Sequence, residues 1–168
     1  MAIEDELAKA LELHQAGELL AAGTMYKEVL AQEPNNVDAL NLLGVIMHTA
    51  NDLELAVELI SRATELAPDY VPALINLGNA LQAVGRPEDA VKKFERALEL
   101  DPGAGIAASN LASALNDLAL HEESRRAGER AVQLSSELPD AYVNLGNALL
   151  GLGRSEAAEA KYTAALEL

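Results

Sequence analysis

Cysteine and tryptophan are both absent from this sequence of 168 residues. The lack of cysteine excludes a disulfide framework, a thiolate zinc site and a cysteine nucleophile, and it is typical of proteins in a reducing compartment. Aromatic residues are also scarce, with four tyrosines and one phenylalanine, although half of all residues are apolar. Alanine and leucine must therefore fill the interior, which favours closely packed helices.

Basic side chains are few, 12 against 27 acidic ones, and the net charge is −15. Nucleic acids and anionic membranes attract lysine and arginine, so we expect neither as a partner. No apolar run approaches the roughly 18 residues of a membrane helix, and the acidic residues 4–6 stand where a secretory signal would be basic. We therefore expect a soluble, cytoplasmic protein whose partners are neutral or basic proteins or peptides.

The sequence repeats itself with a period of 34 residues. The segment NLGNAL at residues 76–81 recurs unchanged at residues 144–149, two periods later. Within a block the apolar residues have helical spacing, and a break such as Gly85-Arg86-Pro87 separates two helices. One helical hairpin cannot bury its apolar face alone, so several must stack. The predicted hairpins are residues 3–36, 37–70, 71–104, 105–138 and 139–168.

Residue types at fixed registers indicate how each hairpin packs. The third hairpin should have a second helix that begins at Pro87 and ends before Pro102. Large residues at one register, Tyr26, Ile60, Phe94 and Tyr162, are expected to fill the space between neighbouring hairpins. The fourth hairpin has Gly128 there, which predicts a packing deficit and a helix-interior glycine cost of about 0.8–1.0 kcal/mol. Gly128→Ala should then stabilise the protein.

These registers together resemble the tetratricopeptide repeat family over essentially the whole chain. The matching features include the Leu77-Gly78 pair, the small Ala90, the aromatic Phe94 and the closing Pro102. The resemblance implies an all-α fold, a right-handed superhelical solenoid of antiparallel helix hairpins, forming one array over residues 1–168. It also implies a protein-interaction scaffold, not an enzyme, in which the first helix of each hairpin lines a concave groove for an extended peptide or partner protein.

Carboxamide side chains dominate the predicted groove. Asn76, Asn110 and Asn144 share one register, and Asn79 and Asn147 lie three residues further along the same helical face. Each carboxamide offers a donor and an acceptor to a peptide backbone, but it could equally bridge neighbouring repeats or face water. The sequence leaves these alternatives open. With the family resemblance, the expected peptide-binding residues are Asn41, Ile75, Asn76, Asn79, Gln82, Asn110, Ser113, Asn116, Val143, Asn144 and Asn147.

Two alternative functions remain at this level. The asparagine row resembles the repeat region of O-linked N-acetylglucosamine transferases, so the chain could be the substrate-recognition part of a longer glycosyltransferase-type enzyme. It also ends at Leu168 without a polar capping helix, which suggests a fragment or a homo-oligomer formed through the last hairpin. No metal site is expected, because His14 and His48 lie one full repeat apart. No catalytic or cofactor site is expected either, because the sequence has no glycine-rich phosphate loop and its acid pairs stand at predicted helix starts.

Overall fold

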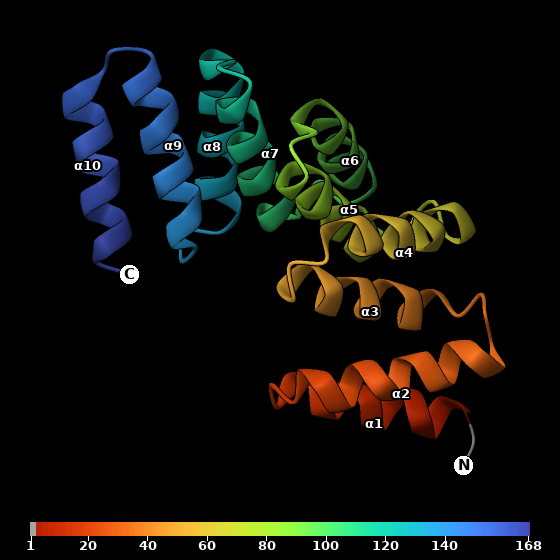
Figure 1. Cartoon of the computed structure of the whole chain (residues 1–168). Coiled ribbons are helices and arrows are strands. Elements are labelled where there is room, and N and C mark those ends of the chain that lie inside the picture. Colours follow the sequence, from red (N-terminus) through yellow and green to blue (C-terminus); the bar gives the residue numbers. More distant parts are fainter. Residues whose placement is uncertain (1–2) are drawn as a thin grey trace. The chain divides into compact units, whose positions relative to one another are not determined.

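The computed structural model of the protein describes residues 3–168, and within that range it contains ten helices and no strand (Figure 1). The helices are α1 (Ile3–Gln15), α2 (Leu19–Gln32), α3 (Val37–Thr49), α4 (Leu53–Leu66), α5 (Val71–Ala83), α6 (Pro87–Leu100), α7 (Gly105–Asp117), α8 (His121–Leu134), α9 (Pro139–Gly151) and α10 (Ser155–Leu166). Five of these helices, α1, α3, α5, α7 and α9, begin at the first residue of a predicted block. Because every regular element between residues 3 and 168 is a helix, the all-α fold class is confirmed.

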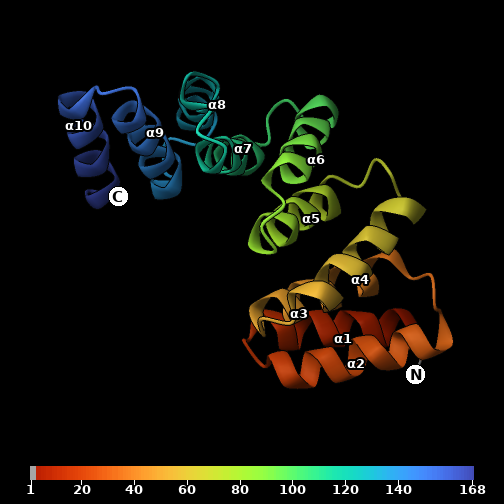
Figure 2. The ribbon, with the colours of Figure 1, turned by 45° about the horizontal axis from the view of Figure 1, so that its top comes forward.

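The chain divides into two compact units, Met1–Ala80 and Leu81–Leu168, which we call the N-terminal and C-terminal units. In the N-terminal unit α1 packs with α2 and α3 with α4, and α2 also contacts α3 (Figure 2). In the C-terminal unit α7 packs with α8 and α9 with α10, and α8 also contacts α9. The pairs α1/α2, α3/α4, α7/α8 and α9/α10 have the hairpin pairing that the repeat predicts.

The core of the hairpins combines small residues with one large residue at the predicted registers. Tyr26 is fully buried and belongs to a cluster with residues of the next hairpin, among them Ala39 and Ile46. Large residues also pack within their own hairpin: a Cβ on Gly44 would overlap Ile60, and one on Gly146 would overlap the ring of Tyr162. The large residue therefore also fills space inside its own hairpin, whereas its register predicted a position between neighbouring hairpins.

Gly128 of α8 has a different role from the one predicted. It is buried, and a Cβ at this position would lie 3.0 Å from Leu145 Cβ and 3.1 Å from Leu145 Cα. The obstacle is partly the backbone of α9, which cannot move without shifting the helix. Gly128 therefore permits a close approach of α8 to α9, and this contact opposes the stabilisation that helix propensity predicts for alanine.

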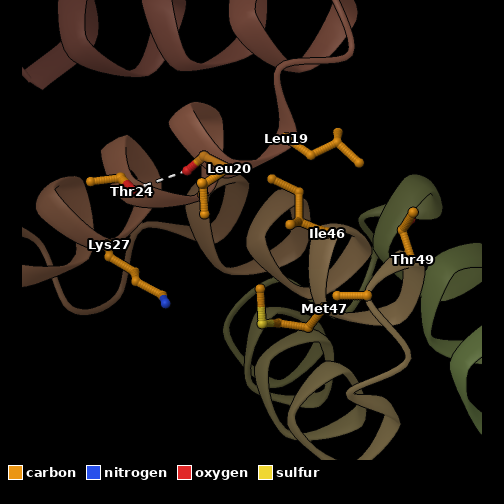
Figure 3. A pocket seen from close by; sticks show the side chains of 9 residues that line it. Leu19, Leu20, Thr24, Lys27, Ile46, Met47 and Thr49 are labelled. Carbon is orange, nitrogen blue, oxygen red and sulfur yellow. Dashed lines mark hydrogen bonds between the residues drawn. The ribbon is translucent and has the colours of Figure 1, made fainter.

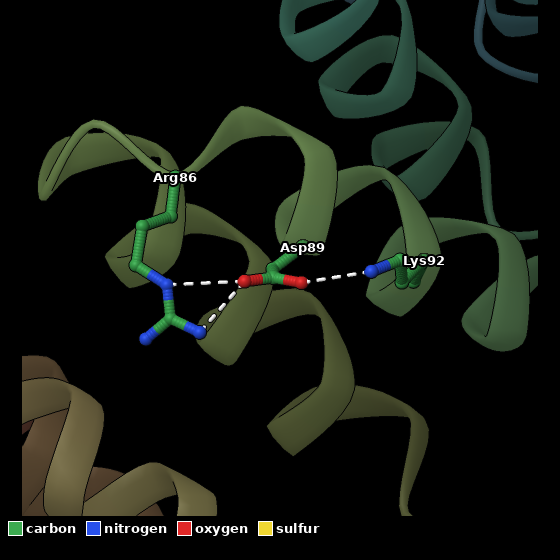
Figure 4. A network of polar contacts seen from close by, with 3 residues as sticks. All are labelled: Arg86, Asp89 and Lys92. Carbon is green, nitrogen blue, oxygen red and sulfur yellow. Dashed lines mark hydrogen bonds and ion pairs between the residues drawn. The ribbon is translucent and has the colours of Figure 1, made fainter.

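The boundaries of α6 follow the prediction. Pro87 is its first residue, and Asp89 in the first turn accepts hydrogen bonds from Arg86 Nη2 at 2.6 Å and Lys92 Nζ at 2.9 Å (Figure 4). These two cations, Lys92 foremost, hold the pKa of Asp89 below its usual value. The helix ends at Leu100, two residues before Pro102.

The turns inside the hairpins share an unusual backbone conformation. Positive φ angles recur every 34 residues, at Gly17 (79°), Asn51 (62°), Gly85 (75°), Ala119 (57°) and Gly153 (74°). Glycine adopts this left-handed region without a steric cost and asparagine tolerates it, whereas alanine is strained there. The fourth hairpin therefore carries a strained turn.

Candidate peptide-binding surface

In the N-terminal unit, the predicted site residues Asn41 and Asn76 form a hydrogen-bonded pair. Asn76 Nδ2 on α5 donates to Asn41 Oδ1 on α3 at 2.9 Å. Asn41 is only 2% exposed, whereas Asn76 is half-buried. Asn36 fixes the start of α3 by accepting a hydrogen bond from the Ala39 backbone N–H at 3.0 Å. Asn41 therefore orients Asn76 and is too buried to contact a ligand directly.

In the C-terminal unit, Asn144 is held in a similar way. Its Nδ2 on α9 donates to Ser109 O at 3.0 Å and to Ser109 Oγ at 3.1 Å on α7. Asn116 Nδ2 donates to the backbone oxygen of Asn144 at 3.0 Å, while Asn116 Oδ1 is buried without a hydrogen-bond partner. Ser109 itself is 1% exposed. The side chain of Asn144 thus bridges two first helices from a half-buried position.

Gln82 and Asn147 are also engaged inside the C-terminal unit. Gln82 Nε2, at the end of α5, donates to Ser113 Oγ at 2.9 Å and to Asp117 Oδ2 at 2.6 Å. Asn147 is exposed, and its Oδ1 accepts a hydrogen bond from Tyr162 Oη at 2.8 Å. These carboxamides connect neighbouring helices, so structural bridging accounts for part of the polar row.

The remaining predicted residues are apolar or half-buried polar side chains. Ile75, Asn79 and Asn110 are half-buried, and Val143 is 37% exposed. Leu150, which the repeat registers did not single out, is 53% exposed. Its spacing of seven residues from Val143 places it on the same face of α9. Contact of a peptide with the predicted residues Ile75, Asn79, Asn110 and Val143 stays a prediction.

The bridging hydrogen bonds use only part of the hydrogen-bonding capacity of Asn76 and Asn144. A carboxamide has two N–H donors and an oxygen that accepts up to two hydrogen bonds. Asn76 and Asn144 use the nitrogen side for bridging, so their Oδ1 atoms can accept a hydrogen bond from a peptide N–H. A bridging role and a binding role are therefore compatible for these two residues.

The Asp38 carboxylate contributes to the raised pKa values of two tyrosines in the N-terminal unit. Tyr70 Oη donates to Asp38 Oδ1 at 2.9 Å. Burial, this hydrogen bond and the charge of Asp38 raise the pKa of Tyr70 to about 12. Burial, with a smaller contribution from the Asp38 charge, also raises the pKa of Tyr26 to about 12. Both phenols are therefore neutral at physiological pH.

Between residues 3 and 168, no three side chains of histidine, cysteine, aspartate or glutamate lie together in a way that could hold a metal ion. Over the same range, every helix is too short or too polar to span a membrane.

Comparison with known proteins agrees with the hairpin architecture. Family models of the tetratricopeptide repeat match residues 13–81, 71–104 and 139–168, and all three describe repeat units. None of the curated proteins compared with the chain matches it.

Several solved structures share the fold. PilF of Pseudomonas aeruginosa superposes with a TM-score of 0.86 at 20% identity, covering 99% of this chain and 76% of PilF. MamA gives 0.80 at 25% identity, covering 94% and 92% of the two chains. YrrB, described as a tetratricopeptide repeat protein with an unusual peptide-binding site, gives 0.77 at 18% identity and covers 96% and 84%.

Proposed function

Because the chain belongs to the tetratricopeptide repeat family, we propose that it is a non-catalytic scaffold that holds an extended peptide against its carboxamide-bearing first helices. The observation that carries the proposal is the same in both units. A half-buried asparagine, held by a bridging hydrogen bond, stands next to an apolar residue: Asn76 beside Ile75 and Asn144 beside Val143. The description of YrrB as a peptide-binding protein of this fold supports the proposal.

The bridging hydrogen bonds of Asn76 and Asn144 favour peptide binding, because they already hold these side chains in place. A side chain whose rotamer is already fixed loses little conformational entropy when it binds a ligand. Each Oδ1 then accepts a backbone N–H of the peptide irrespective of the peptide's side chains. The surface therefore selects an extended backbone more than a particular sequence.

The expected affinity is modest. One hydrogen bond contributes about 0.5–1.5 kcal/mol net, whereas micromolar binding needs about 8 kcal/mol. Apolar contacts with side chains such as Val143 and Leu150 must supply most of the difference. Amide hydrogen bonds carry no net charge, so the affinity for a neutral peptide should depend only weakly on salt.

The charge of the units favours a neutral or basic peptide. Residues 1–80 contain 13 acidic and 3 basic side chains, and residues 81–168 contain 14 acidic and 9 basic ones. Both units are net negative, so a strongly acidic peptide would be repelled.

The experiment uses peptides selected for binding to the full chain from a display library of random sequences. Val143→Ala should weaken binding of the selected peptides several-fold with little change in unfolding, because Val143 is 37% exposed. Leu134→Ala is the matched control, since Leu134 is 39% exposed but lies on α8, a second helix. Peptides that bind both variants as tightly as the wild-type chain would contradict the proposal.

A second pair of variants separates binding from bridging. Asn144→Ala removes both the bridge to Ser109 and the Oδ1 acceptor, whereas Ser109→Ala removes only a hydroxyl at the bridge. We expect Asn144→Ala to weaken peptide binding and Ser109→Ala to leave it nearly unchanged. Equal losses of binding would show that Asn144 acts only through stability.

A further inference from the structure

Helices α2 and α3 of the N-terminal unit enclose an open apolar hollow of about 300 Å³, which we call the α2/α3 pocket (Figure 3). The side chains of Leu19, Leu20, Ile46 and Met47 surround it, and Lys27 lies at its edge. It lies outside the predicted peptide-binding residues. Its volume is at the lower end of the range for ligand pockets, which suits one or two side chains of a partner.

The exposure of the Leu20 side chain indicates that this pocket has a role other than packing. The side chain is 89% exposed, so it contributes almost nothing to the core. The other four hairpins all have glutamate at this register: Glu54, Glu88, Glu122 and Glu156. Glutamate in the first turn of a helix interacts favourably with the helix dipole. An exposed leucine replaces a residue that would stabilise α2, whose first turn contains no acid.

Gly23 keeps the pocket open. Two other hairpins have a valine at this register, Val57 and Val91. The backbone does not require glycine here, because a Cβ on Gly23 would lie 3.7 Å from Ile46 Cγ2, an ordinary contact distance. Glycine inside a helix lowers its stability relative to other residues. Glycine at residue 23 therefore carries a cost in helix stability that no packing contact requires, and it leaves empty space between α2 and α3.

Lys27 gives the pocket its charge preference. At this register the other hairpins have serine, glutamate, glutamate and threonine. Within the described part of the N-terminal unit, Lys27 makes no ion pair, whereas Arg62 donates to Asn35 Oδ1 at 2.7 Å. The hydroxyl groups of Thr24 and Thr49 at the rim donate to carbonyl oxygens of their own helices. The Lys27 ammonium is therefore the rim group suited to pair with a ligand, and it favours a carboxylate.

We propose that the α2/α3 pocket is a second docking site, which takes an aliphatic or aromatic side chain of a partner peptide whose adjacent carboxylate pairs with Lys27. The N-terminal unit is strongly acidic elsewhere, so the partner carries a single carboxylate beside its apolar anchor and not an acidic run. This site differs from the carboxamide surface in position and in charge preference. It does not depend on peptide binding there.

The test measures binding of acetyl-Leu-Glu-amide to the full chain by NMR, with acetyl-Leu-Gln-amide as the uncharged match. We expect weak binding that shifts the backbone amide signals of Gly23, Lys27 and Met47. The glutamate probe should bind about two- to five-fold more tightly, as an exposed ion pair allows. Lys27→Gln should bring the two affinities together.

Two variants block the pocket with residues that the other hairpins already have at these registers. Gly23→Val fills the hollow and Leu20→Glu removes an apolar wall, and each should reduce binding of both probes at least about ten-fold. Both variants should fold, which thermal unfolding would verify. Leu11→Glu is the control, because Leu11 is 39% exposed on α1 outside the pocket.

Three results would overturn the proposal. The first is that Gly23→Val binds the probes as tightly as the wild-type chain does. The second is that the two probes bind the wild-type chain with equal affinity. The third is concentration-dependent association of the wild-type chain that Leu20→Glu abolishes, since the occupant would then be a second copy of this chain.

Discussion

Replacing Ala119 with glycine should stabilise the protein, because this residue adopts a left-handed backbone conformation that an alanine Cβ opposes. Its φ angle is 57°, and three of the four corresponding turn positions have glycine: Gly17, Gly85 and Gly153. A Cβ added to any of these glycines would meet no atom within 4 Å. The difference between alanine and glycine at this register therefore lies in the backbone and not in packing.

The size of the effect follows from two opposing contributions. A non-glycine residue in the left-handed region costs about 1–2 kcal/mol. Glycine increases the entropy of the unfolded chain, which offsets about 0.4–1 kcal/mol of the gain. The central values give a net stabilisation of about 0.8 kcal/mol for Ala119→Gly. The reverse change, Gly85→Ala, should destabilise by a similar amount.

Urea titration followed by circular dichroism measures both variants. Ala119→Gly should raise the unfolding midpoint without a change in slope, because the surface exposed on unfolding is the same. Asn51→Gly is a useful third variant, since asparagine already tolerates a positive φ, here 62°, and the gain should be smaller. A midpoint for Ala119→Gly at or below that of the wild-type chain would refute the strain at this turn.

Three further predictions concern packing, charge and pH. Gly128→Ala should destabilise by about 1–3 kcal/mol, because its Cβ would press on the α9 backbone at Leu145, and a raised urea midpoint would contradict this. Leu20→Glu should stabilise the protein by about 0.3–1 kcal/mol through the dipole of α2. A lower melting temperature would instead show that the Leu20 side chain stabilises the folded protein. Burial lowers the pKa of His14, which contacts Tyr26, so its neutral form is favoured in the folded protein. The resulting stability should be present above pH 6.5 and decline as the pH falls below it, and urea titrations of His14→Phe should show a weaker decline.

The repeat made most of the fold predictable from the sequence. The predicted repeat blocks begin at residues where helices begin, among them Val37, Val71, Gly105 and Pro139, because each hairpin obeys the same local rules. Helix propensity favours alanine at Gly128 because it describes a residue in its own helix, whereas the space at Gly128 is set by Leu145 in another helix. Local rules fail where a backbone from elsewhere in the sequence sets the available space.

The candidate site was predictable only in outline. The register identified the asparagines, but not the bonding of Asn144 to Ser109 or the burial of Asn41. The α2/α3 pocket was visible in the sequence only as exceptions to the repeat at Leu20 and Gly23. Only the structure shows that these two residues line an open hollow and that the Leu20 side chain is 89% exposed.

Photocrosslinking from Val143 tests the central claim most directly. A benzoylphenylalanine placed at residue 143 should crosslink to a peptide selected for binding, because the side chain there is 37% exposed beside Asn144. The same group at Leu134, which is 39% exposed on α8, should not crosslink. A peptide that crosslinks equally from both positions, or only from residue 134, would contradict binding on the first helices.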